Sequence, residues 1–195
     1  SRMVADRLRA DVQVVSQSGW GVVCSWDNNP RFTLPSVYDF ICKPAALESA
    51  DGTAHGGEKP YDFSFDPDAI VVNLGTNDAS ALNQPAYVDP KTGASFRLTL
   101  EDAPMFEEAV YRFILHLHEK NPRARILWLY GLISGVLTPY LESAVSRAKA
   151  DGVDATYLPL PDVDSIRSGV GSRQHPGVGA HRRMADIVCA ELGKK

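Results

Sequence analysis

Short apolar runs alternate along this chain with longer stretches in which apolar residues recur at helical spacing. The short runs predict strands at Val12 to Ser16, Ala69 to Leu74, Arg125 to Tyr130 and Ala155 to Leu158. The amphipathic stretches predict helices from about Asp102 to Lys120, from Thr138 to Gly152 and from Ala180 to Leu192, with Met3 to Leu8 ending an earlier helix. This alternation is typical of a parallel sheet covered by helices on both faces. We therefore expect a single α/β domain over residues 1–195, a three-layer α/β/α sandwich of flavodoxin-like type.

One long insertion interrupts this pattern. Residues Asp27 to Ser64 are rich in Pro and Gly, with one short predicted helix around Ser36 to Ile41. Connections of this length inside a compact domain are usually functional. We expect the insertion to lie over the carboxyl-terminal edge of the sheet.

Polar residues follow two of the predicted elements at places that suit chemistry. The strand that ends at Leu74 is followed by Gly75-Thr76-Asn77-Asp78, which carries an Asn and an Asp into a loop. About a hundred residues later, His175 lies in a Gly-rich turn ahead of the last helix. An Asn amide can donate to a developing oxyanion and a loop His can act as a general base. The pair indicates acyl-transfer chemistry.

Three segments together resemble the SGNH (GDSL-type) hydrolases. Ser18-Gly19-Trp20-Gly21 resembles the family's Gly block, Gly75-Thr76-Asn77-Asp78 its Asn block, and His175-Pro176 its His block. The resemblance spans nearly the whole chain, and the Ser-Gly-x-Gly segment is similar to that of certain carbohydrate esterases. It implies the SGNH hydrolase fold and a serine esterase that hydrolyses small acyl esters, such as acetyl groups, on carbohydrate.

The chain departs from the family in two places. It contains no Gly-Asp-Ser, and in the family that nucleophile turn would lie before Ser1, after a central first strand. We therefore expect an upstream peptide segment to supply the first strand and the nucleophile, and residues 1–195 alone to be inactive. Three residues before His175, where the family has an Asp that orients the imidazole, this chain has Ser172. Ser172, a main-chain carbonyl, Asp162 and Asp164 are the alternatives for that orienting role.

The resemblance implies a role for each matched residue, and each has a simpler alternative. His175 would be the catalytic base, or a loop His that caps the next helix. Gly19 and Asn77 would form the oxyanion hole, or an ordinary turn and an Asx-turn. Asp78 would support the loop. Trp20 and Trp26, beside the polar run Asp27-Asn28-Asn29, would bind sugar, or Trp20 would shield the core.

Two hypotheses from other classes compete with the esterase. A non-catalytic carbohydrate-binding module derived from this fold would keep the sugar-facing loop without a nucleophile. A flavodoxin-like nucleotide binder would need a phosphate loop after the first strand, and Gly19-x-Gly21 is too short for a dinucleotide fingerprint. Ser16, Ser18 and Ser25 are the serines near the expected site, and none sits in a nucleophile elbow.

Composition and charge disfavour several classes of binding partner. The formal net charge of -4 and the absence of a long basic run disfavour nucleic acid. The longest apolar run, Ile126 to Leu137, is too short to cross a bilayer, so no membrane partner is expected. The proposed mechanism requires no cofactor. Three cysteines without C-x-x-C spacing disfavour a zinc site and leave a Cys24–Cys42 disulfide open. Secretion or a periplasmic location is an expectation from the family resemblance alone.

Overall fold

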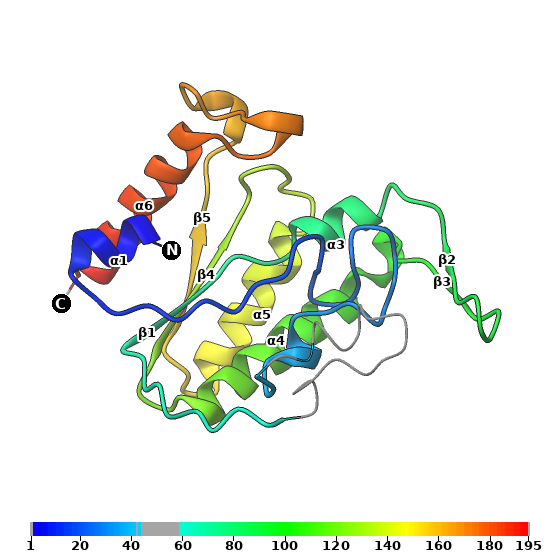
Figure 1. Cartoon of the computed structure of the whole chain (residues 1–195), viewed down its shortest axis with the longest axis horizontal. Coiled ribbons are helices and arrows are strands. Elements are labelled where there is room, and N and C mark those ends of the chain that lie inside the picture. Colours follow the sequence, from blue (N-terminus) through cyan, green and yellow to red (C-terminus); the bar gives the residue numbers. More distant parts are fainter. Residues whose placement is uncertain (1, 42, 44–58, 195) are drawn as a thin grey trace.

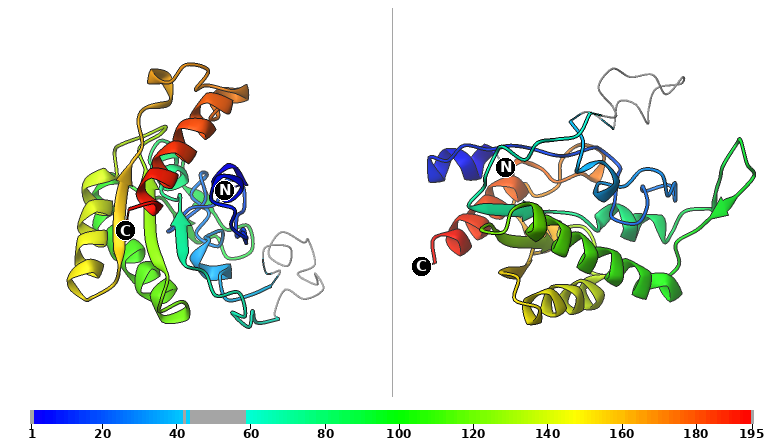
Figure 2. Two further views of the ribbon diagram at one scale, coloured as in Figure 1. Left: turned by 90° about the vertical axis from the view of Figure 1, so that its left-hand side faces the viewer. Right: turned by 90° about the horizontal axis from the view of Figure 1, so that it is seen from below.

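The core of the fold is a parallel sheet between two helical layers. The computed structural model describes residues 2–41, 43 and 59–194. Strands β1 (Ala69–Val72), β4 (Arg125–Tyr130) and β5 (Ala155–Pro159) form the sheet, in the order β1-β4-β5. Helices α4 (Ala103–Lys120) and α5 (Thr138–Ala150) cover one face, and α1 (Arg2–Leu8) and α6 (Val178–Leu192) cover the other (Figure 1 and Figure 2). The predicted three-layer α/β/α architecture is confirmed.

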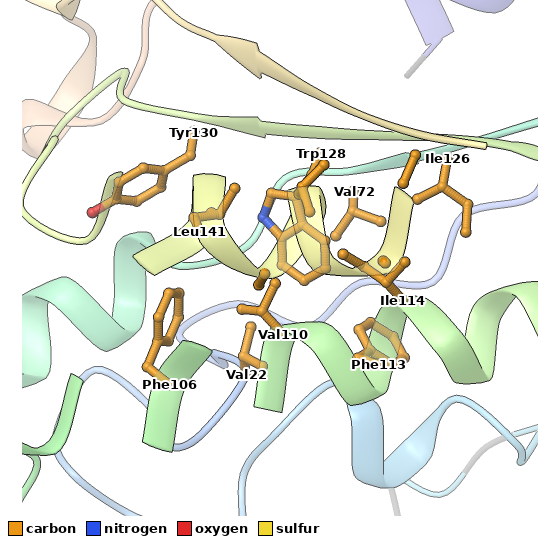
Figure 3. Close-up of a cluster of buried hydrophobic side chains, with 14 of the residues drawn as sticks. Val22, Val72, Phe106, Val110, Phe113, Ile114, Ile126, Trp128, Tyr130 and Leu141 are labelled. Carbon is orange, nitrogen blue, oxygen red and sulfur yellow. The ribbon is translucent and has the colours of Figure 1, made fainter. Parts of the chain in front are cut away.

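The alternation of side chains along β4 builds both halves of the core. Successive residues of a strand point to opposite faces of its sheet. Ile126, Trp128 and Tyr130 pack with the α4 and α5 side chains (Figure 3), and Leu127 and Leu129 pack with residues of α6. All five are almost fully buried, so β4 is the central strand and reads as a continuous apolar run.

Smaller elements sit at the carboxyl-terminal edge of the sheet and beyond it. Helix α3 (Thr76–Ala81) follows β1, and the two-stranded hairpin β2 (Tyr87–Val88) with β3 (Ser95–Phe96) projects from the body (Figure 1). The described residues also form the short 3₁₀ turns η1 (Pro35–Val37), η2 (Leu100–Asp102), η3 (Val163–Ser165) and η4 (Ser172–Gln174). No helix within the described ranges is long and apolar enough to span a membrane.

The strand predicted at Val12 to Ser16 is wrong for this structure. Residues 11–17 are irregular, and Val14 and Val15 are 57% and 52% exposed. Strand β1 pairs with β4 alone, and Val71 on it is 44% exposed. Residues 9–17 run past β1 (Figure 1) without forming a ladder with it. An apolar run becomes a strand only where backbone hydrogen-bond partners meet it, and the described residues offer none here.

Candidate active site

Asn77 lies in the first turn of helix α3. The sequence pattern had predicted a loop at this position. Gly75 precedes the helix with φ 113°, and a Cβ there would lie 3.2 Å from the Tyr130 ring. A side chain at this position would be strained and crowded, so only glycine turns the chain from β1 directly into α3. The turn places Asn77 at the carboxyl-terminal edge of the sheet (Figure 1).

The side-chain amide of Asn77 is partly committed to the protein. Its Nδ2 donates to the carbonyl oxygen of Trp20 at 2.8 Å. A primary amide carries two N–H groups. One therefore anchors the Asn77 side chain to the neighbouring loop, and the second can donate to a substrate oxygen.

Asp78 is fully buried and holds the loop that contains Gly19, here called the Gly19 loop (residues 18–29). Its carboxylate accepts hydrogen bonds from the backbone N–H groups of Val22 (2.9 Å), Val23 (2.7 Å) and Cys24 (3.4 Å). Burial raises the pKa of Asp78 more than these donors lower it. A Cβ on Gly21 would collide with the same carboxylate. Asp78 is thus enclosed by the loop and cannot touch a substrate.

The two tryptophans of the Gly19 loop occupy opposite environments. Trp20 is 3% exposed and stacks on Phe32 with the ring centroids 5.0 Å apart. The prediction that Trp20 binds substrate is therefore wrong, because its ring is part of the core. Trp26 is 50% exposed, and its ring lies against the Gly19 backbone. The backbone N–H of Trp26 donates to the Gly19 carbonyl at 2.9 Å. Trp26 forms an exposed aromatic wall beside Gly19.

The polar residues that follow Trp26 are mostly buried, whereas sugar binding would require them to be exposed. Asn28 and Asn29 are 0% and 6% exposed, so their amides cannot reach sugar hydroxyls. Asp27 is exposed, and its carboxylate accepts from the Ser25 hydroxyl. Ser25 itself is buried. Of this run, only Asp27 can face a ligand.

His175 is held by the backbone of its own loop. The Nδ1 atom of His175 lies 3.0 Å from the carbonyl oxygen of Arg173. The Arg173 backbone has a left-handed φ of 52°. A carbonyl can only accept, so Nδ1 must carry the proton and Nε2 is left with a free lone pair. The imidazole is exposed. This tautomer and exposure are those that a general base requires.

Among the described residues, none of the other candidates for orienting His175 hydrogen-bonds to its ring. Ser172 accepts from the His175 backbone N–H through its carbonyl oxygen, at 3.0 Å. The Asp162 side chain accepts from the Asp164 N–H, 2.8 Å away, at the start of η3. His181 lies exposed in the first turn of α6. Of the four alternatives, the structure therefore shows the main-chain carbonyl at the imidazole.

Backbone pairing fixes the loop that carries His175. The N–H of Gly171 donates to the His175 carbonyl, that of Gly177 to Gly169, and that of Gly179 to Ser168 at 3.0 Å. Val170 and Pro176 form an antiparallel bridge. These bonds make a narrow double-stranded loop between β5 and α6, with His175 at its turn.

The structure thus presents two groups at the carboxyl-terminal edge of the sheet. Gly19, Trp26, Asn77 and Asp78 belong to one connected set, and His175 stands in the separate loop after β5 (Figure 1). Within the described ranges, no serine hydroxyl hydrogen-bonds to the His175 ring. The same part of the chain contains no group of three His, Cys, Asp or Glu residues that could hold a metal ion.

Cys24 is a buried free thiol in the Gly19 loop. Burial, with smaller contributions from Asp78 and Asp27, raises the pKa of Cys24 to about 12. The thiol therefore stays protonated and unreactive at neutral pH. Cys42, the candidate disulfide partner of Cys24, lies outside the described residues.

Comparisons with known proteins identify the fold. No protein-family model matches this chain. It is 25% identical over 197 residues to an acetylxylan esterase / glucomannan deacetylase of Cellvibrio japonicus, covering 99% of this chain and 48% of that protein. Among solved structures, an acetyl xylan esterase (Est2A) of Butyrivibrio proteoclasticus is 34% identical, with a TM-score of 0.88, over 98% of this chain and 53% of that one.

A second solved structure connects the chain to GDSL-type enzymes. A putative GDSL-like lipase of Bacteroides ovatus superposes with a TM-score of 0.60 at 15% identity, over 100% of this chain and 77% of that one. The fold is therefore that of the SGNH/GDSL hydrolases, and the homologues are carbohydrate esterases, as the motifs indicated. The chain spans less than half of the length of the curated relatives it matches.

Proposed function

We propose that these residues carry the base and the oxyanion hole of a serine esterase that removes small acyl groups, acetyl in particular, from carbohydrate. The observation that carries the proposal is the His175 imidazole, exposed and held at Nδ1 by the Arg173 carbonyl. The Asn77 amide, which is anchored on the Trp20 carbonyl and has a second N–H, also supports the proposal. The names of the relatives support the carbohydrate ester as substrate.

In this mechanism a serine Oγ attacks the acyl carbonyl while His175 Nε2 takes the hydroxyl proton. The carbonyl oxygen becomes an oxyanion that receives hydrogen bonds from the free N–H of Asn77 and the backbone N–H of Gly19. His175 then protonates the sugar oxygen as it leaves, and an acyl-serine remains. Water, deprotonated by His175, hydrolyses the acyl-serine and releases the acid.

A main-chain carbonyl takes the place of an Asp in orienting His175. It fixes the imidazole tautomer as a carboxylate would, but it carries no full negative charge to stabilise the imidazolium. We infer a Ser-His dyad with Arg173 as the orienting residue, through its backbone. Ser172 contributes its carbonyl to the same turn.

The serine, in this proposal, comes from an upstream segment that adds a parallel strand beside β1. Two features support this position. Strand β1 is an edge of the sheet with Val71 exposed, and the apolar run Val12 to Ser16 lies unpaired and exposed nearby. A parallel strand inserted there would end at the carboxyl-terminal edge, beside Gly19 and Asn77. We call residues 1–195 preceded by such a segment the extended polypeptide.

Trp26 and Asp27 are the substrate-facing residues of the Gly19 loop in this proposal. An exposed indole offers a flat apolar face that suits a pyranose ring, and the Asp27 carboxylate can accept from sugar hydroxyls. The non-catalytic alternative has less support, because the relatives bear esterase names.

Acetate release from acetylated xylan tests the proposed function. We expect the extended polypeptide to release acetate from acetylated xylan and to cleave 4-nitrophenyl acetate, because both need only a small acyl group at the oxyanion hole. A matched control is the same polypeptide with the upstream serine replaced by Ala. Acetate is measured with an enzymatic assay. If the polypeptide bound the glycan but released no acetate, the result would favour the non-catalytic carbohydrate-binding module instead.

A further inference from the structure

Asn28 is a buried side chain in the Gly19 loop that the proposed mechanism does not use. It is 0% exposed, and its backbone has the left-handed φ of 67°. A polar side chain that is fully buried must find hydrogen-bond partners or destabilise the fold. Apart from the Cys24 thiol, which lies 3.9 Å from its Oδ1, the hydrogen-bond partners of the Asn28 side chain lie outside its own loop.

The Asn28 amide joins three separate segments of backbone. Its Nδ2 donates to the carbonyl oxygens of Ala81 at 2.9 Å, Pro85 at 3.0 Å and Gln84 at 3.3 Å. Its Oδ1 accepts from the N–H of Leu98 at 2.9 Å. The Nδ2 atom meets carbonyl oxygens and the Oδ1 atom meets an N–H group, so both polar atoms of the side chain have hydrogen-bond partners.

These bonds complete a frame between the Gly19 loop and α3. Near the amino end of α3, Asn77 holds the Trp20 carbonyl and Asp78 holds the amides of residues 22–24. At the carboxyl end of α3, Asn28 holds Ala81. The loop is therefore fastened to the helix at both ends by side chains that bond to backbone.

The two oxyanion donors lie on opposite members of this frame. Gly19 belongs to the loop and Asn77 to α3, so their separation and relative angle depend on how firmly loop and helix are joined. Oxyanion stabilisation requires both donors at fixed positions before the reaction starts. We propose that Asn28 is a positioning residue that keeps the Gly19 and Asn77 donors in register, an inference that rests on the proposed esterase function.

The same amide also fastens the base of the projecting hairpin. Pro85 precedes β2 and Leu98 follows β3, and both are bonded to Asn28. An isolated pair of two-residue strands has little stability of its own. The Gly19 loop, α3 and the two stems of the hairpin therefore open and close as one unit.

Hydrogen exchange on the unmodified chain tests this frame without any variant and without activity. The N–H groups of Val22 and Val23 report the Asp78 end, and that of Leu98 reports the Asn28 end. We expect all three to exchange with the same opening free energy and the same denaturant dependence, as members of one cooperative unit. Leu98 exchanging through a separate, weaker opening would overturn the proposal.

Kinetics of matched variants test the positioning role in the extended polypeptide. Asn28→Gly removes the amide and keeps the left-handed backbone, which glycine adopts without strain. Asn29→Ala is the control, because the Asn29 side chain bonds to the Arg31 N–H within its own turn. We expect Asn28→Gly to lower kcat by about 10- to 100-fold with KM changed less than about twofold. Asn29→Ala should leave both within about threefold of the parent.

The outcomes separate this inference from the proposed function. A parent protein that hydrolyses no ester refutes the proposed function, and the exchange of Val22 and Val23 in Asn28→Gly still tests the frame. Faster exchange at those two amides, which bond to Asp78 and not to Asn28, supports the frame. An active parent whose Asn28→Gly variant keeps its kcat and its exchange rates refutes the inference. If Asn28→Gly does not fold, the exchange measurement on the unmodified chain decides.

Discussion

Replacing His175 with alanine should abolish ester hydrolysis by the extended polypeptide. The imidazole is the only group that the proposal uses to move protons, both from the serine and to the leaving sugar oxygen. Loss of such a base lowers kcat by about 10⁴- to 10⁶-fold in serine hydrolases. The measurement is kcat for 4-nitrophenyl acetate at pH 8, with a folded variant verified by circular dichroism.

His181→Ala is the matched control for this prediction. His181 is an exposed histidine six residues away on α6, and the proposal gives it no part in the reaction. Its replacement should leave kcat within about twofold of the parent. If His175→Ala retained more than about a tenth of the activity, His175 would be a structural loop residue and the base would have to be sought elsewhere.

Asn77→Ala has the second largest expected effect. It removes the amide that, in the proposed mechanism, donates to the oxyanion, an interaction that is strongest in the transition state. Loss of one such donor lowers kcat by about 10²- to 10³-fold, and KM should change little because the ground-state carbonyl is bound more weakly. Steady-state kinetics with 4-nitrophenyl acetate separate the two constants.

Asn73→Ala is the control for the Asn77 variants, and Asn77 has a second, structural role that those variants also remove. Asn73 is an exposed asparagine just after β1, and Asn73→Ala should behave like the parent. Asn77 also anchors the Trp20 carbonyl, so its loss loosens the Gly19 loop as well. Asn77→Asp keeps the shape of the side chain but replaces the donating amide with a carboxylate that can only accept, so it should be at least as inactive as Asn77→Ala. A variant of Asn77 with an unchanged kcat would remove this residue from the oxyanion hole.

The regular elements of the second half of the chain could be predicted because each carries its own signal. Helix α4 has apolar residues at helical spacing along eighteen residues, and β4 is a continuous apolar run. Such periodicity depends on the sequence alone. The helix from Thr138 and the strand from Ala155 were confirmed for the same reason.

The elements that were missed depend on partners that sequence periodicity does not reveal. The run Val12 to Ser16 has the composition of a strand, but a ladder needs a neighbouring strand and the described residues provide none. The β2–β3 hairpin was not predicted, because strands of two residues are too short to show an alternation of apolar and polar residues. Helix α3 is only six residues long and begins at a glycine with positive φ.

The sequence indicates candidate site residues by type, but it does not indicate the environment of each one. His175, Asn77 and Gly19 stood out through their motifs and their positions after strands. Nothing in the sequence distinguished buried Trp20 from exposed Trp26, because burial is set by tertiary packing on Phe32. Asn28 had one usable signal: Asn tolerates the left-handed conformation better than most residues, and it lies in a run of turn-forming residues.

The central claim is that His175 activates a serine on a strand beside β1. Treatment of the extended polypeptide with a fluorophosphonate, followed by intact mass and peptide mapping, tests it most directly. We predict one phosphonyl adduct, on the upstream serine, and no adduct in the His175→Ala variant. An adduct on Ser18 or on another serine within residues 1–195, or none on an active enzyme, would contradict the account.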